Sequence, residues 1–218
     1  MSSKDPTLVI GLGRFGRALA ETLADLGHEV MGVDTSPRIV QSCSVSLTHV
    51  VQADATDIEA LRQIGATDFP RAVIAIGTDV QASILATYSL VDLKMPRIWA
   101  KAITAEHGAI LERVGAHKVV FPERDMGTRV ARTMVGRTID YLEIAENFVL
   151  IETTAPKEIT GMTLEEAKVR GRYNITIVCI RRPGEAFTYA TPETRIHAGD
   201  IVVVAGEPRH AEEFSNLD

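Results

Sequence analysis

The chain has 218 residues, of which 23 are basic and 29 are acidic, so its formal net charge is −6 at pH 7. This acidic balance argues against a nucleic-acid partner, because proteins that bind nucleic acids usually carry a basic surface. Every apolar run is shorter than the roughly 20 residues of a membrane-spanning helix, and two cysteines, Cys43 and Cys179, are too few for a disulfide framework, which fits a reducing cytoplasm.

The first part of the chain alternates short apolar runs with longer helical patterns. Ser36 and Pro37 have the order of an N-cap followed by proline at the first helical position. Strands that alternate with helices indicate right-handed crossovers, and six of them predict one doubly wound parallel sheet. The expected strands are Thr7–Ile10, Val30–Val33, Val50–Ala53, Ala72–Ile76, Ile98–Lys101 and Lys118–Phe121, and the expected helices are Arg17–Leu26, a helix from Pro37, one from a capping box at Thr56–Glu59 to Gly65, Val80–Leu93 and Ala105–Val114.

The pattern changes after residue 124. Asp125–Arg137 reads as an amphipathic helix and Tyr141–Asn147 as a polar, irregular stretch. The remaining elements are short and predict a small α+β domain, so we expect a first domain over residues 1–124, a connecting helix and linker over 125–147, and a second domain over 148–218. The last domain should contain strands Phe148–Thr153, Ile175–Ile180, Ala186–Tyr189 and Ile201–Ala205, a helix Leu164–Arg170 opened by a capping box at Thr163–Glu166, and a short helix Arg209–Ser215.

A glycine motif follows the first expected strand. The segment Gly11-Leu-Gly-Arg-Phe-Gly16 is a GxGxxG placed between a strand and a helix, which is the context that a Rossmann-like dinucleotide site requires. Gly11 permits the tight turn, Gly13 lets a phosphate approach the backbone, and Gly16 lets the helix pack closely on the strand. The amides at the helix N-terminus would then face the anion, with Arg14 and Phe15 inside the loop.

Two charged side chains extend this motif. Asp34 ends the second expected strand, close to the spacing at which an acidic residue accepts hydrogen bonds from the ribose hydroxyls, and its charge disfavours the extra phosphate of NADP. Arg14 could make bidentate contacts with phosphate. The alternative role of Asp34 is that of an aspartate in a helix-capping turn, and the alternative for Arg14 is a solvated surface arginine.

Other polar residues follow later strands at the edge where open α/β sheets bind ligands. His107 and Glu123 come shortly after the fifth and sixth strands, where a cap or a surface group is the commoner role. The other residues at these strand ends are Asp54, Ala55, Thr56, Ile76, Gly77, Thr78, Asp79 and Lys101.

A catalytic constellation is not evident in the sequence. Metal-ligand clusters of His and Cys and a GxSxG nucleophile motif are lacking. A small NAD-dependent oxidoreductase remains the alternative function, but its substrate domain would offer only His197 and His210 as proton donors. A third hypothesis is an adaptor that binds nucleotide only to stabilise its fold.

Several segments together resemble the cytoplasmic regulatory subunits of Ktr/Trk potassium-uptake systems, in which an RCK (KTN) domain is followed by an RCK-C domain. The resemblance covers nearly the whole chain, and the PERDMG segment is closer to the Ktr branch than to the Trk branch. The segments that carry it are Val9–Gly16, Asp54–Thr56, Ala75–Gly77, Gln81–Ser83, Ile98–Lys101 and Phe121–Gly127.

The resemblance implies a protein that is not an enzyme. It implies a cytoplasmic homodimer that assembles into a ring, octameric in expectation, on the inner face of the membrane, where it gates a potassium-translocating subunit. The ligand would be ATP or ADP, with NAD or NADH as alternatives; Arg14 would reach the terminal phosphate across a subunit interface, and Glu123 would help hold a divalent or monovalent cation. The matching pocket positions are Arg14, Asp34, Thr35, Ser36, Asp54, Ala55, Ile76, Gly77, Thr78, Lys101, His107 and Glu123.

The same resemblance implies a second ligand, cyclic di-AMP, at a dimer interface of the C-terminal domain. Arg170 matches an arginine that contacts its phosphates, Pro192 matches a pocket proline, and Thr176 stands where relatives carry an asparagine. A favourable charge at a helix C-terminus is the alternative role of Arg170.

The helix Asp125–Arg137 also bears on assembly. It comes after the last strand of the first sheet, and its apolar residues Met126, Val130, Met134 and Val135 lie at near-helical spacing. We expect this face to pack on a second copy of the chain in a two-fold dimer; the alternative is that it folds back on its own C-terminal domain.

Overall fold

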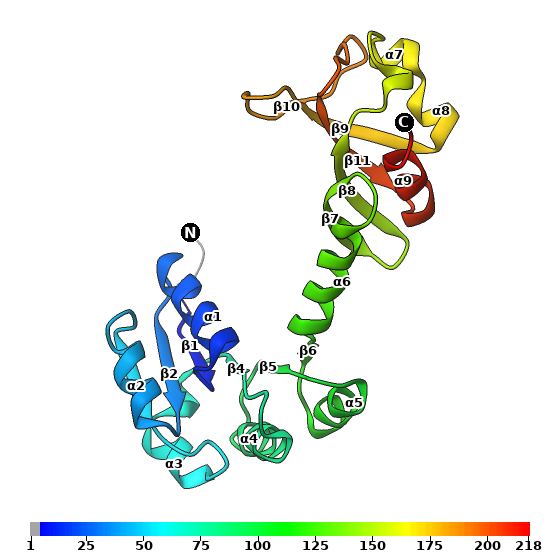
Figure 1. The fold of residues 1–218 in the computed structure, drawn as a ribbon. Helices are drawn as coiled ribbons and strands as arrows, with labels where there is room; N and C mark the ends of the chain where they lie inside the picture. Colours follow the sequence, from blue (N-terminus) through cyan, green and yellow to red (C-terminus); the bar gives the residue numbers. More distant parts are fainter. Residues whose placement is uncertain (1–4) are drawn as a thin grey trace. The chain divides into compact units, whose positions relative to one another are not determined.

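The computed structural model describes residues 5–218, and the chain divides into two compact units between Glu123 and Arg124. Each unit has its own sheet (Figure 1). Each also has its own hydrophobic core. Helix α6 (Pro122–Met134) begins at the end of the first unit and continues into the second. Among residues 5–218, no helix combines the length and the hydropathy that crossing a membrane requires.

The N-terminal unit is the predicted doubly wound α/β domain. All six strands are parallel, in the order β3-β2-β1-β4-β5-β6, and the chain changes direction between β1 and β4. That change of direction opens a crevice at the carboxyl ends of the central strands. The elements are β1 (Thr7–Ile10), α1 (Arg14–Asp25), β2 (Val30–Asp34), α2 (Pro37–Cys43), β3 (His49–Gln52), α3 (Ile58–Gln63), the 3-10 helix η1 (Ala66–Asp68), β4 (Ala72–Ile74), α4 (Val80–Asp92), β5 (Ile98–Lys101), α5 (Ala105–Val114) and β6 (Lys118–Val120).

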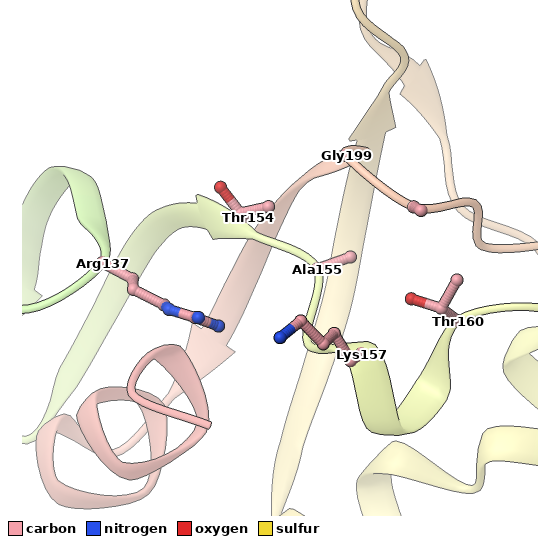
Figure 2. Close-up of a pocket in the computed structure, with 7 residues that line it drawn as sticks. Arg137, Thr154, Ala155, Lys157, Thr160 and Gly199 are labelled. Atoms are coloured by element: carbon pink, nitrogen blue, oxygen red, sulfur yellow. The ribbon is translucent and has the colours of Figure 1, made fainter. Parts of the chain in front are cut away.

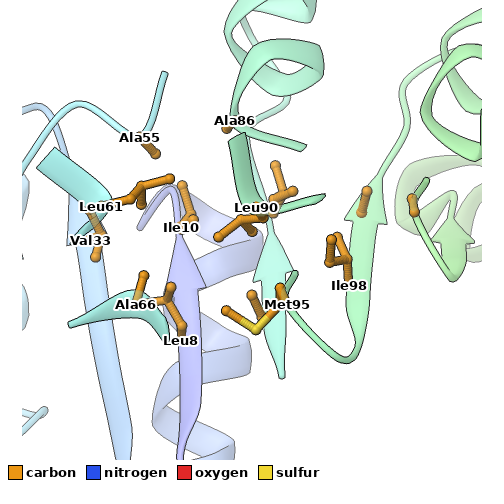
Figure 3. Close-up of a cluster of buried hydrophobic side chains, with 14 of the residues drawn as sticks. Leu8, Ile10, Val33, Ala55, Leu61, Ala66, Ala86, Leu90, Met95 and Ile98 are labelled. Atoms are coloured by element: carbon orange, nitrogen blue, oxygen red, sulfur yellow. The ribbon is translucent and has the colours of Figure 1, made fainter. Parts of the chain in front are cut away.

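The central strand β1 is buried along its whole length because the sheet is covered on both faces. On one face, Leu8 and Ile10 belong to a buried cluster that also contains Leu61, Leu90 and Ile98 (Figure 3). On the other face a second cluster gathers Val9, Leu12, Ala20, Val30, Cys43 and Leu47.

Several local predictions in this unit, and the bounds of the helix that follows it, need correction. Helix α1 begins at Arg14 rather than Arg17, because Gly13 serves as the N-cap and its carbonyl accepts the first intrahelical hydrogen bond. The cap of α3 is Asp57, whose carboxylate accepts from Glu59 N, so the predicted capping box at Thr56 is wrong. Strands β4 and β6 are shorter than expected, and α6 starts at Pro122 and ends at Met134 rather than spanning Asp125–Arg137.

The C-terminal unit is the small α+β domain that was expected. Its sheet is antiparallel, in the order β10-β9-β11-β8-β7. Its core is built around Ile151, Ile196, Val204 and Phe214. The elements are β7 (Thr138–Ala145), β8 (Phe148–Thr154), the 3-10 helix η2 (Lys157–Ile159), α7 (Leu164–Ala167), α8 (Val169–Tyr173), β9 (Ile175–Arg181), β10 (Thr188–Tyr189), β11 (Ile201–Gly206) and α9 (Pro208–Ser215).

Two predictions fail in this unit, and β10 is shorter than the expected strand Ala186–Tyr189. The stretch Tyr141–Asn147 is not irregular, because most of it lies in β7, which pairs with β8 at the edge of the sheet. The single helix expected over Leu164–Arg170 is two short helices, since Lys168 adopts a left-handed conformation with φ of 46°. The capping box between Thr163 and Glu166 is confirmed.

Candidate functional site

The glycine loop joins β1 to α1 at the crevice of the N-terminal sheet. Gly11 has φ of +88°, and a Cβ on Gly16 would lie 1.8 Å from the Gly11 carbonyl oxygen, so both positions exclude larger side chains. A Cβ on Gly13 would meet nothing within 4 Å. The loop is therefore tight where helix and strand pack, and open at the helix N-terminus where an anion would approach.

Asp34 lies at the end of β2 and is bonded to this loop. Its Oδ2 accepts a hydrogen bond from Leu12 N at 2.8 Å, and its Oδ1 accepts one from Ser36 N, also at 2.8 Å. Each carboxylate oxygen has a second lone pair that can accept from a hydroxyl. The carboxylate thus fixes the loop and the start of α2, and it retains capacity for a ribose.

Lys101 ends β5 and is paired with Glu123 in the first turn of α6. Lys101 is only 7% exposed, and its Nζ lies 2.5 Å from Glu123 Oε1. The ammonium also lies 5.6 Å from the centre of the Phe15 ring, and a Cβ on Gly77 would come within 2.9 Å of it. The hydrogen bond from Lys101 holds the pKa of Glu123 below its ordinary value, with a smaller contribution from the charge of Arg14.

Glu123 provides a single carboxylate for a cation. Among residues 5–218, no three His, Cys, Asp or Glu side chains are grouped so that they could hold a metal ion. Magnesium is commonly held by one or two carboxylates together with phosphate oxygens and water. The donor set therefore fits a cation that takes its remaining ligands from nucleotide phosphates.

His107 lies buried in the first turn of α5, with 3% of its surface exposed. Its Nδ1 accepts a hydrogen bond from Ile103 N at 3.4 Å, and burial lowers the pKa of the imidazole, which favours the neutral ring with its proton on Nε2. Nε2 is itself buried, and no residue in the described part of the chain accepts from it, so this donor is unsatisfied in the structure.

The other predicted positions differ in what they offer. Asp54 is exposed, and its Oδ1 accepts from both the backbone N and the hydroxyl of Thr56. The side chain of Ala55 packs into the core shown in Figure 3, and Ile76 packs against the same cluster. Thr35 and Thr78 are exposed at the strand ends. Ala55 can therefore contribute only main-chain atoms to a ligand.

Of the three residues expected to bind cyclic di-AMP in the C-terminal unit, two lie together. Arg170 Nε donates to Thr176 Oγ1 at 3.3 Å, at the junction of α8 and β9. Pro192 lies instead beside the start of α7, where its carbonyl accepts from Glu165 N at 3.0 Å. Because only Nε of Arg170 donates to Thr176, the other N–H groups of this exposed guanidinium can still donate to a ligand.

A cavity of about 560 Å³ in the C-terminal unit coincides with none of these positions. In Figure 2 the side chains of Arg137 and Lys157 extend toward one another across it. Arg137 already donates to the Leu217 carbonyl, and Lys157 N donates to the Asp218 carbonyl. The end of the chain thus uses part of the donor capacity around this cavity.

Lys101 and Glu123 were both expected in the site, but their pairing, with Phe15 beside the ammonium, was not predicted. A lysine at the end of the apolar strand Ile98–Lys101 was the available signal, since a buried lysine needs a partner. Which acidic residue supplies the partner depends on how the end of β5 meets the start of α6, 22 positions later in the chain.

Comparison with known families defines the class of protein. Residues 7–122 match the TrkA-N domain, and residues 148–217 match the TrkA-C domain. The chain is 38% identical to the Ktr system potassium uptake protein C of Bacillus subtilis (strain 168), over 91% of this chain and 90% of that protein. It is 33% identical to the Ktr system potassium uptake protein A of the same organism, over 95% and 94% of the two chains.

The chain therefore belongs to the TrkA-N/TrkA-C family that includes these Ktr potassium uptake proteins, which confirms the resemblance found in the sequence. A solved structure of GsuK bound to ADP is also similar, with 26% identity and a TM-score of 0.52 over 62% of this chain. The chain spans 35% of that longer protein.

Proposed function

We propose that the chain is a cytoplasmic regulatory subunit of a potassium-uptake system, which binds ATP or ADP and gates a membrane potassium-translocating partner without catalysis of its own. The observation that carries the proposal is the meeting of the open glycine loop, Asp34 and the Lys101–Glu123 pair at the crevice of the first sheet. It is supported by relatives that are named potassium uptake proteins and by a similar structure described as bound to ADP.

In this proposal the nucleotide lies along the carboxyl ends of the strands. The ribose hydroxyls donate to Asp34, and the phosphates face Gly13 and the amides at the start of α1. His107 Nε2 and Lys101 Nζ supply further donors. The remaining contacts come from Gly11, Phe15, Gly16, Thr35, Ser36, Asp54, Ala55, Ile76, Gly77 and Thr78.

Arg14 distinguishes ATP from ADP. It is the first residue of α1, it is exposed, and its charge acts on Glu123. A guanidinium there can engage a terminal phosphate that only ATP possesses, across a subunit interface as the resemblance to the Ktr branch implies. Glu123 adds a cation at the same phosphate. Gating requires that ATP and ADP favour different ring conformations, since a ligand with equal affinity for both shifts neither.

The homodimer forms through the apolar face of α6. Met126, Val130 and Met134 are 54%, 46% and 78% exposed, although three large apolar side chains on one helix favour burial. A second copy of the chain presents the same face, so a two-fold axis would cover both. Dimers then assemble into a ring, octameric in our proposal, on the inner face of the membrane.

The C-terminal unit is proposed to take cyclic di-AMP. Arg170 would contact a phosphate, with Thr176 holding the guanidinium and Pro192 in the pocket wall. Thr176 offers one hydroxyl where an asparagine would offer a longer amide, so we expect weaker binding than an asparagine at this position would allow.

A ligand panel tests the proposal. Calorimetric titrations of the purified protein with ATP, ADP, NAD, NADH and cyclic di-AMP, with and without magnesium, should rank ATP and ADP first. Light scattering should then show different assemblies with ATP and ADP. Identical assemblies would favour the adaptor that uses nucleotide only for stability. Tight NADH binding with turnover would favour the oxidoreductase, and no binding of any nucleotide would refute the proposal.

A further inference from the structure

The side chain of Lys101 brings a positive charge into a nearly closed environment. A buried ammonium is costly unless an opposite charge and hydrogen bonds compensate for its lost hydration. Glu123 supplies the opposite charge at 2.5 Å, and the Phe15 ring supplies a weaker cation–π contact. The absence of a side chain at Gly77 leaves room for the ammonium. Lys101 is thus held in one place, with its charge directed at Glu123.

Glu123 is the more exposed member of this pair. Its side chain is 65% exposed, whereas that of Lys101 is 9% exposed. Only its Oε1 is bonded to Lys101, so the carboxylate remains accessible to solvent and to ions. The group proposed to hold a diffusible cation therefore already carries a cation that belongs to the chain.

We propose that Lys101 is a tethered counter-cation of Glu123, which competes with the diffusible cation and sets how strongly nucleotide binding depends on it. This inference rests on the proposed function and adds a determinant of cation dependence to the same site. While Lys101 neutralises Glu123, phosphates can approach without a metal ion. Without the ammonium, the carboxylate of Glu123 repels the phosphates until a diffusible cation binds to it. That cation then binds more readily, because no ammonium competes with it for the carboxylate.

Two simpler roles for Lys101 make different predictions. If Lys101 only contacts phosphate, its removal weakens ATP binding equally with and without magnesium. If it only stabilises the fold, its removal lowers the unfolding temperature and leaves affinity unchanged. The decisive quantity is therefore the magnesium factor, defined as the ATP dissociation constant without magnesium divided by the constant with magnesium.

The experiment measures this factor by calorimetry for the full chain and for Lys101→Met, Glu123→Gln and the double variant. Lys118→Met is the matched control, because this lysine lies on the neighbouring strand β6 and its ammonium sits 4.5 Å from the Trp99 ring centre. Circular dichroism verifies folding. Lys101→Gln, which keeps a neutral donor, replaces Lys101→Met if that variant does not fold.

We expect Lys101→Met to raise the magnesium factor about tenfold, the effect of one charge-assisted hydrogen bond. Glu123→Gln and the double variant should have the same magnesium factor, lower than that of the wild type. Lys118→Met should keep the wild-type magnesium factor. A wild-type or smaller factor in Lys101→Met and Lys101→Gln would overturn the inference while leaving the proposed nucleotide site intact. If ATP binding by the wild type does not depend on magnesium, the proposal that Glu123 holds a cation in the wild type is refuted. In that case Lys101→Met must acquire a magnesium dependence, and without it the inference about Lys101 is overturned as well.

Discussion

Alanine substitutions at Gly13 and Gly16 should separate the two tasks of the glycine loop. A methyl group on Gly16 would lie 1.8 Å from the Gly11 carbonyl oxygen and 2.9 Å from the Ala75 methyl, so the backbone must move. Overpacking usually costs about 1–3 kcal/mol, and a backbone obstacle places this variant at about 3 kcal/mol or above. That is a large part of the total stability of a domain, typically about 5–15 kcal/mol.

Gly13→Ala should behave in the opposite way. The new methyl group meets nothing within 4 Å, and φ of −63° with ψ of −173° suits any residue. Lower entropy of the unfolded chain stabilises by about 0.4–1 kcal/mol, and alanine is a poorer N-cap by a similar amount, so the free energy of unfolding should hardly change. Because the methyl occupies the space of the phosphate, ATP and ADP affinity should fall tenfold or more, on the order of 1.4 kcal/mol.

Urea unfolding followed by circular dichroism, without nucleotide, measures the free energy of unfolding. Calorimetry with ATP and ADP measures the nucleotide affinity. Gly127→Ala is the control, because a Cβ there also meets nothing within 4 Å and lies within α6. It should stabilise the helix by up to about 1 kcal/mol and leave affinity unchanged. Wild-type ATP affinity in Gly13→Ala would show that the loop does not receive the phosphates, and wild-type stability in Gly16→Ala would refute the close packing.

Three further predictions concern ligand and assembly. Asp34→Ala should weaken all adenine nucleotides by about tenfold to a hundredfold, because a charge-assisted bond to the ribose is lost; calorimetry showing unchanged affinity would exclude the ribose contact. Arg14→Ala should narrow the gap between ATP and ADP affinity, and Glu123→Gln should reduce the magnesium dependence of ATP binding; if both variants keep the wild-type ATP/ADP ratio with and without magnesium, discrimination lies elsewhere. Glutamates at Val130 and Met134 should break the dimer in light scattering, whereas an unchanged oligomer mass with intact circular dichroism would mean that α6 is not the interface.

Much of the first unit could be predicted because its signals are local. An apolar strand, a glycine turn and an amphipathic helix each follow from a few consecutive residues, and their alternation leaves a parallel sheet as the economical arrangement. Asp34 could be placed near the glycine loop for the same reason, since neighbouring parallel strands end at the same edge of the sheet. The position of the candidate site thus followed from periodicity and topology.

The errors fall where the sequence pattern is weak or the conformation unusual. Strand β7 is an edge strand with many exposed residues, so its sequence lacks a clear alternation, and its pairing with β8 defines it. The break between α7 and α8 lies at Lys168, a residue type that seldom adopts positive φ, so composition gave no sign of it.

The sequence by itself determined the order of the elements, the glycine loop and the acidic residue at the end of β2, because each depends on residues close together in the chain or on a fixed topological rule. Only the tertiary structure decided that Asp34 is bonded to Leu12 N and that Lys101 is paired with Glu123. These contacts join positions 22 apart, and the free energy of such a pair depends on burial and distance, which no local pattern encodes.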